Sequence, residues 1–223
     1  MEHIHGSTSP KSGSGKEEKE AILGGMAHYY DKLSFIWFQG REKAIRQMTI
    51  EMAGIKPGDR VLEIGCGPGS LTLQAKMQAG PDGKVCGIDA APEMVAVAQT
   101  KVEKAGIDIE FKQGFLQEIP YPDQNFDQVL CSFMIFHTSE KVRVKGFAEI
   151  DRVLKPGGRI FILDANTPSR PWVKKIVGAV MGAMARHSVA ELIPLLQANG
   201  FKDIQAGPTR FRMFAFISGV KAA

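Results

Sequence analysis

Apolar residues follow two spacings along this chain, and their order predicts one α/β domain. Short apolar runs typical of buried strands fall at residues 60–64, 84–89, 109–112, 128–132 and 160–164, and two more follow at 201–206 and 213–218. Apolar residues at helical spacing fill the segments between and after them, at 70–79, 92–105, 140–154 and 188–199. Strands and helices that alternate in this way predict a doubly wound, mostly parallel sheet with helices on both faces.

The first 58 residues depart from this repeating pattern. Residues 1–20 are rich in Ser, Gly, Lys and Glu and have almost nothing apolar to bury, which predicts a disordered tail. Residues 21–58 have a helical pattern with a break near Gly40, and aromatic residues are dense in its first half. We interpret 21–58 as a helical cap placed before the main domain, 59–223.

A glycine-rich turn follows the first strand and provides the strongest chemical signal. Val61 to Ile64 is followed by three glycines two residues apart, Gly65, Gly67 and Gly69, and a helical pattern then begins at Ser70. Glycine can turn with positive φ and lets a ligand approach the backbone. In doubly wound sheets, such a turn at the carboxyl end of a strand binds nucleotide-like ligands. A dinucleotide fingerprint, G-x-G-x-x-G, would need its third glycine at Ser70.

The run Glu63-x-Gly65-x-Gly67-x-Gly69 instead resembles motif I of the class I S-adenosylmethionine (SAM) dependent methyltransferases. Three further motifs occur in the order of that family: Asp89 at the end of the second strand, the segment Tyr121 to Asp127, and the turn Leu154-Lys155-Pro156-Gly157-Gly158-Arg159. The resemblance covers residues 29–220. It implies a Rossmann-like fold with seven strands, an antiparallel strand near the C-terminus, and SAM as the cofactor.

The resemblance also implies which residues hold the cofactor. The glycine turn would contact its methionyl part, and Asp89 would accept hydrogen bonds from the ribose hydroxyls; the alternative for Asp89 is a cap on the following helix. Tyr29, Tyr30 and Phe133 are candidates to contact the cationic sulfonium. The expected cofactor-binding residues are Tyr30, Glu63, Gly65, Cys66, Gly67, Gly69, Asp89, Ala90, Met94, Gly114, Phe115 and Ser132.

Two positions depart from the family's pattern. After the glycine of the third strand's end, Gly114, the family usually carries Asp or Asn to hold adenine, whereas this chain has Phe115. The family often has a pair of histidines after the fourth strand, and this chain keeps only the second, His137. We take His137 as the candidate catalytic residue; the alternative is a packed histidine without a chemical role.

Charge is distributed unevenly. The chain has a net charge of +4, and residues 165–223 contain eight Lys or Arg against two Asp or Glu, so the remaining residues carry −2. Residues 171–187 form an apolar segment with basic ends within a lid-like insertion, 168–187. We interpret it either as a substrate lid or membrane-surface helix, or as an ordinary insertion packed on the body.

These features predict a SAM-dependent methyltransferase that acts on a small-molecule or lipid-like acceptor, as in the quinone-biosynthesis and phospholipid N-methylating groups that the chain resembles. A non-catalytic SAM-binding protein and a NAD-dependent oxidoreductase are the alternatives. The sequence has no acceptor motif for nucleic acid and no signal peptide, so we expect a cytoplasmic protein, with peripheral membrane contact through 171–187 if that helix lies on a membrane. Three cysteines without metal-ligand spacing predict reduced packing residues and no metal site.

Overall fold

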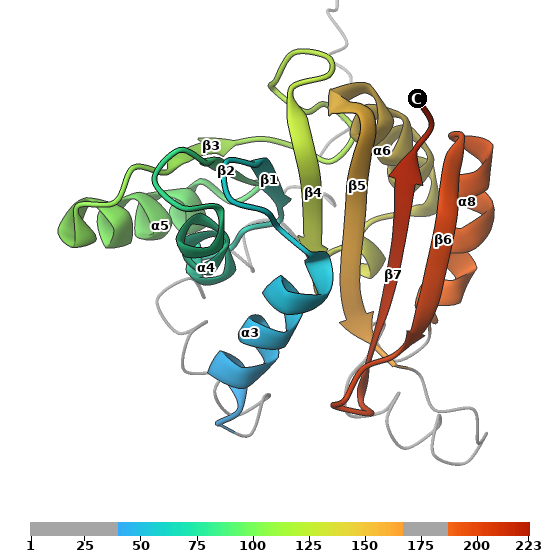
Figure 1. Ribbon diagram of the computed structural model, residues 1–223, viewed down its shortest axis with the longest axis horizontal. Coiled ribbons are helices and arrows are strands. Elements are labelled where there is room, and N and C mark those ends of the chain that lie inside the picture. The colour runs from blue at the N-terminus through green and yellow to red at the C-terminus, as the bar shows by residue number, and fades with distance from the viewer. Residues whose placement is uncertain (1–39, 167–186) are drawn as a thin grey trace, which may run out of the picture.

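One seven-stranded sheet organises the computed structural model, which describes residues 40–166 and 187–223. The strand order is β3-β2-β1-β4-β5-β7-β6 (Figure 1). The strands are Arg60–Ile64 (β1), Lys84–Asp89 (β2), Glu110–Gln113 (β3), Phe126–Ser132 (β4), Leu154–Ala165 (β5), Phe201–Pro208 (β6) and Phe214–Lys221 (β7). β1 to β5 pair in parallel, whereas β7 runs antiparallel to both β5 and β6. The predicted fold, with its antiparallel C-terminal strand, is confirmed.

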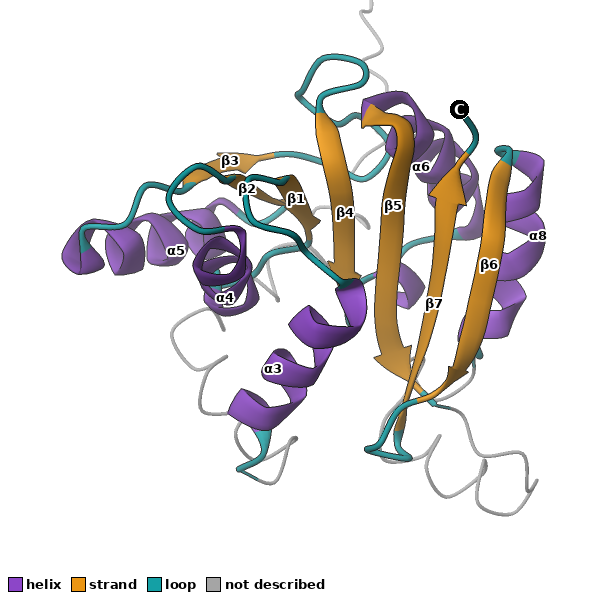
Figure 2. Ribbon diagram, viewed as in Figure 1, coloured by secondary structure: helices purple, strands orange, loops and turns teal. Residues whose placement is uncertain are grey.

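Helices cover both faces of this sheet, as the secondary-structure colouring of Figure 2 shows. They are α3 (Glu42–Ala53), α4 (Ser70–Ala79), α5 (Pro92–Ala105), α6 (Glu140–Val153) and α8 (Ile193–Ala198), with short 3₁₀ helices η1 (Ile135–His137) and η3 (Val189–Leu192). The predicted tail, most of the lid-like segment and the first half of the predicted cap lie outside the described residues. Within the described ranges, no helix is long and apolar enough to cross a membrane.

Local sequence signals account for the ends of the main helices. Pro92 stands in the first turn of α5, where its fixed φ suits a helix start, and Gly106 ends the helix with φ of 63°. Ser139 caps α6 by accepting a hydrogen bond from the backbone N–H of Val142. Pro92 and Gly106 explain why the predicted bounds of α5 coincide with those of the structure.

The two larger apolar cores of the described residues lie on opposite faces of the sheet, and a third, smaller one packs α5. One of the two larger cores packs α6, η3 and α8 through residues such as Phe147, Ile150 and Leu196. The other packs α3 and α4 through residues such as Met48 and Ala75. Because side chains alternate along a strand, Leu62 and Ile64 of β1 belong to the first core and Val61 to the second. Glu63 therefore faces the same side as Val61, toward α3 and α4.

The largest differences from the sequence prediction are in β5 and in the last helix; the bounds of other elements differ by at most three residues. β5 begins at Leu154 and not at Ile160, because Leu154 pairs with Phe126 before residues 155–158 bulge out and pairing resumes at Arg159 with Gln128. The predicted helix 188–199 is divided into η3 and α8, with Pro194 in the first turn of α8. Proline has no N–H to donate to η3, so the helix type changes there.

Candidate functional site

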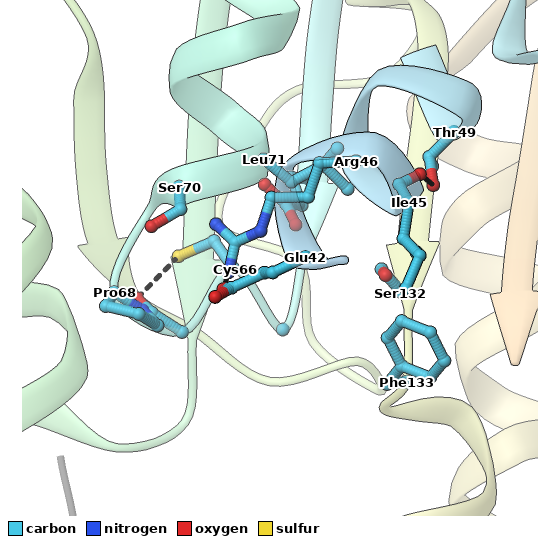
Figure 3. Close-up of a pocket in the computed structure, with 13 residues that line it drawn as sticks. Glu42, Ile45, Arg46, Thr49, Cys66, Pro68, Ser70, Leu71, Ser132 and Phe133 are labelled. Atoms are coloured by element: carbon cyan, nitrogen blue, oxygen red, sulfur yellow. Dashed lines mark hydrogen bonds and ion pairs between the residues drawn. The ribbon is translucent and has the colours of Figure 1, made fainter. Parts of the chain in front are cut away.

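A pocket opens at the carboxyl ends of β1 and β4. These neighbouring strands connect onward to opposite sides of the sheet, and such a switch point leaves a crevice that binds ligands in doubly wound folds. Figure 3 shows that α3, the glycine turn, the first turn of α4 and the end of β4 form its walls. The lining residues are Glu42, Ile45, Arg46, Thr49, Glu63, Gly65, Cys66, Gly67, Pro68, Ser70, Leu71, Ser132 and Phe133.

The glycine turn is tied to the end of β2. The backbone N–H groups of Gly65 and Cys66 both donate to the carbonyl oxygen of Ile88, at 2.8 and 3.0 Å. The next N–H, that of Gly67, donates to Oδ2 of Asp89 at 2.8 Å. The turn and Asp89 are therefore held as one unit, 22 residues apart in sequence.

Packing within the protein adds a second reason for glycine in this turn. Gly65 and Gly69 have φ of 71° and 74°. A Cβ at Gly65 would stand 2.7 Å from Cγ of Met134, and one at Gly69 would stand 2.7 Å from Cζ of Phe111. We expected these glycines to make room for a ligand. At these two positions, neighbouring side chains already fill the space that a Cβ would need.

Asp89 accepts hydrogen bonds from two backbone segments, the glycine turn and the start of α5. Its Oδ1 accepts a hydrogen bond from the backbone N–H of Ala91, the N-cap residue of α5, at 3.0 Å. Burial raises the pKa of this carboxyl, and the bonds from Ala91 and Gly67 oppose the increase. Ala90 also donates to this carboxyl, and since a carboxylate has about four acceptor positions, at least one remains for a ligand hydroxyl.

Glu63 is the most strongly perturbed acid of the pocket. Its side chain is buried and accepts a hydrogen bond from the hydroxyl of Thr72 in α4. Burial raises its pKa from 4.5 to about 8, although the Thr72 bond and the positive charge of Arg46 both favour the ionised form. Much of the Glu63 population is therefore protonated at neutral pH.

The three cysteines are buried and free, as predicted. Cys66 lines the pocket, and burial together with the nearby acids Glu63 and Asp89 raises the pKa of its thiol. A thiol in that state is a packing residue and a poor nucleophile. Among the described residues, no cluster of His, Cys, Asp or Glu is suited to hold a metal ion.

The end of β4 forms the apolar wall of the pocket. Ser132 is the last residue of the strand, and Phe133 follows with φ of 54°, a conformation that is rare for an aromatic residue. Its N–H donates to the carbonyl oxygen of Leu163 at 2.9 Å, and its ring meets the edge of Phe214 with 5.1 Å between centroids. Strained backbone of this kind concentrates at ligand sites.

The remaining predicted residues are not among those that line the pocket. Gly69 is the N-cap of α4. Met94 is buried in α5, and the N–H of Gly114 donates to the carbonyl oxygen of Asp89 at 3.0 Å. Phe115 is 37% exposed. The other two predicted residues, Ala90 and His137, are exposed at the ends of β2 and η1. Tyr30 lies outside the described residues.

The sequence analysis missed the contribution of α3. Glu42, Arg46 and Thr49 reach the pocket from this helix, and Arg46 forms an ion pair with Glu42 one turn earlier. This helix was predicted as part of the helical cap 21–58, where Tyr29 and Tyr30 were the candidate contacts to the cofactor. The signal was present, because positions 42, 46 and 49 share one helical face.

A second buried acid, Asp164, lies at the same edge of the sheet, near the end of β5. Its Oδ1 accepts a hydrogen bond from the N–H of Ala165 at 2.7 Å. Burial raises its pKa to about 7, and the charge of His187 partly opposes the increase. No pattern in the sequence distinguishes this residue from an ordinary residue near a strand end.

Comparison with known proteins agrees with this geometry. A family described as "Methyltransferase domain" matches residues 61–158. The chain is 29% identical to "Ubiquinone/menaquinone biosynthesis C-methyltransferase UbiE" of Geobacter sp. (strain M21) over 213 residues, covering 85% of this chain and 90% of that protein. It is 30% identical to "Demethylmenaquinone methyltransferase" of Lactobacillus johnsonii over 203 residues, covering 80% of this chain and 82% of that one.

Solved structures share the fold. A SAM-dependent methyltransferase from Aquifex aeolicus superposes with a TM-score of 0.67 at 25% identity, covering 78% of this chain and 88% of that chain. A Haemonchus contortus phosphoethanolamine N-methyltransferase also gives a TM-score of 0.67, at 21% identity over 81% of this chain and 53% of that chain, and shows the fold alone.

The sheet order and the glycine turn together define a Rossmann-like methyltransferase fold, because a dinucleotide-binding sheet has the order 3-2-1-4-5-6 without the antiparallel β7. Relatives that align over most of both chains show the family as well as the fold. The chain belongs to the class I SAM-dependent methyltransferase family. The dehydrogenase alternative is therefore wrong.

The residues of the pocket fit this cofactor. SAM carries a positive sulfonium, a positive amino group and a negative carboxylate, and supplies an electrophilic methyl group when bound. Two carboxyl groups (Glu42 and Glu63) and one guanidinium (Arg46) stand among the described lining residues, with Asp89 tied to the glycine turn. Arg46 offers a partner to the carboxylate, Glu42 offers one to a positive group, and Asp89 offers an acceptor for ribose hydroxyls.

Proposed function

We propose that this enzyme transfers the methyl group of SAM to a ring carbon of a quinol-type acceptor, a small aromatic molecule with a lipid-like tail. The proposal is carried by the relatives, which are named for quinone methylation and align with 80–85% of this chain and 82–90% of their own length. Similarity over nearly the whole of both chains includes the segments beyond the cofactor pocket, where family members differ in acceptor.

The aromatic side of the pocket supports an acceptor of this kind. Phe133 lies between the pocket and Phe214, and partly buried Phe211 packs against the same core. A quinol ring could stack on such a surface, whereas a zwitterionic headgroup would lose hydration there. Methylation forms a carbon–carbon bond as the carbon–sulfur bond breaks, and the ring proton then leaves to a base. We retain His137 as the proposed base.

We also propose the cofactor-binding roles predicted above for the pocket and its border. The turn at Gly65–Gly67 would contact the methionyl part, and Asp89 the ribose. Methyl transfer from a sulfonium is an in-line displacement, so the reaction would gain mainly from positioning and desolvation of the reacting groups. Phe115, at the place where the family holds adenine, would contribute a stacking face and no side-chain acceptor.

Methyl transfer to a panel of acceptors tests the proposal. The purified protein is incubated with methyl-labelled SAM and one of four acceptors: a short-tailed demethylmenaquinol, a matching benzoquinol, phosphoethanolamine or phosphatidylethanolamine vesicles. We expect label to appear on a quinol carbon. The matched control is the corresponding menaquinol, which already has a methyl group at that ring position and should receive none. Label on either ethanolamine compound, or on no acceptor while SAM binds, would overturn the quinol assignment.

A further inference from the structure

Arg46 is the one cation among the described residues that line the pocket. It forms an ion pair with Glu42 of the same helix. Its guanidinium contacts the carboxylate of Glu42, four residues earlier, and the two side chains are only 16% and 21% exposed. Figure 3 shows both side chains extending from α3 over the glycine turn, beside Cys66. An internal carboxylate thus neutralises a cation at the place where the amino-acid end of the proposed cofactor would lie.

The opposite wall also suits a negative group. The N-terminal turn of α4 faces the pocket through Ser70 and Leu71, and its N-cap is Gly69, which has no side chain to cap the helix. The first turn of α4 contains no acidic residue. A helix N-terminus carries partial positive charge, so a ligand carboxylate placed between α4 and Arg46 would face positive potential on two sides.

We propose that Arg46 anchors the carboxylate of the cofactor's methionyl end, and that Glu42 occupies Arg46 until that carboxylate displaces it. The inference rests on the proposed cofactor site, but not on the identity of the acceptor. In the exchange one carboxylate replaces another on the same guanidinium, so Arg46 stays paired while the displaced Glu42 side chain turns away toward solvent. Glu42 therefore lowers the affinity for SAM and for its product, both of which must break the internal ion pair.

Two ligands that differ only at the amino-acid end separate this role from a structural one. S-adenosylhomocysteine has the carboxylate, whereas 5′-methylthioadenosine keeps the nucleoside and sulfur but lacks it. Calorimetric titration of both ligands needs neither an acceptor nor turnover. For Arg46→Gln we expect an affinity for S-adenosylhomocysteine lower by about 10- to 100-fold, the effect of losing a hydrogen bond to a charged group. Affinity for 5′-methylthioadenosine should change by no more than about twofold, because this ligand makes no contact with Arg46 and a substitution that removes no contact has a small effect.

Glu42→Gln should change the affinity for S-adenosylhomocysteine in the opposite direction to Arg46→Gln. Removal of the internal competitor should tighten S-adenosylhomocysteine by about two- to fivefold, the worth of a partly exposed ion pair, and leave 5′-methylthioadenosine unchanged. Lys43→Gln is the matched control, because Lys43 is exposed on the same turn of α3 and does not line the pocket. It should alter neither affinity.

The outcomes discriminate between the parts of the proposal. If Arg46→Gln weakens both ligands equally, or neither, Arg46 does not anchor the carboxylate. If Glu42→Gln weakens S-adenosylhomocysteine, Glu42 is a partner of the ligand and the exchange is wrong. A failed acceptor panel with these titrations as expected would refute only the quinol assignment. Binding of 5′-methylthioadenosine by each variant also verifies that the variant is folded.

Discussion

The buried carboxyl of Glu63 should make the free enzyme less stable as the pH rises. Its pKa is 4.5 in an unfolded chain and about 8 in the fold. Between these values the folded protein holds a proton that the unfolded chain has released. The stability that this group contributes is therefore fully present below pH 4.5, falls as the pH rises, and levels off above pH 8.

The size of the effect follows from the difference in pKa. One unit corresponds to about 1.4 kcal/mol, so a rise from 4.5 to about 8 gives at most about 5 kcal/mol over the whole range. Glu63→Gln removes the titration and keeps an oxygen that can accept from Thr72. The free energy of unfolding of this variant should exceed that of the wild type by a margin that grows by up to about 4 kcal/mol between pH 5 and pH 8.5.

Urea unfolding at several pH values measures this margin. The comparison with wild type is essential, because Asp164 also has a raised pKa and contributes a loss of stability in the same direction. Glu103→Gln, on the exposed last turn of α5, is the control and should follow the wild-type curve. Parallel curves for Glu63→Gln and wild type would refute the reasoning, since Glu63 would then be ionised in the folded protein at little cost.

Three further predictions address the pocket and its surroundings. Asp89→Asn should weaken S-adenosylhomocysteine and 5′-methylthioadenosine alike, by about 10- to 100-fold in titration, because both carry the ribose; unchanged affinity would mean that the ribose lies elsewhere. Gly69→Ala should lower the free energy of unfolding by about 2–4 kcal/mol, from left-handed backbone and overpacking against Phe111, whereas Gly106→Ala, which has the same left-handed backbone (φ of 63°) but open space, should lose only about 1 kcal/mol; equal losses in urea unfolding would argue against the packing role. His137→Gln should reduce turnover of the identified acceptor by about 100-fold with unchanged S-adenosylhomocysteine affinity; wild-type turnover would remove His137 from the mechanism.

The sequence predicted the fold in detail where local signals and long-range structure agree. The bounds of β1, β2, α4 and α5 follow from glycines, a proline and apolar spacing within each segment. The start of β5 could not be predicted in this way, because the pairing of Leu154 with Phe126 depends on the register of another strand. Pro194, in contrast, was a visible signal for the division of the last helix.

The pocket residues of the glycine turn could be predicted from the sequence, whereas those that α3 contributes from the other side of the pocket could not. Glu63, Gly65, Cys66 and Gly67 are close in sequence, and Ser132 follows from the position of β4 at the same edge. Arg46 and Glu42 reach the pocket only because α3 packs on α4 in three dimensions. The raised pKa of Glu63 likewise depends on burial from both sides, which no spacing in the sequence reports.

A crystal structure of the protein with S-adenosylhomocysteine tests the central claim most directly. The account predicts the homocysteine part along Gly65–Gly67, its carboxylate within hydrogen-bond distance of Arg46 with Glu42 turned away, and the ribose hydroxyls on Asp89. A ligand bound outside this pocket, or one bound within it while the Arg46–Glu42 ion pair stays closed, would contradict the account.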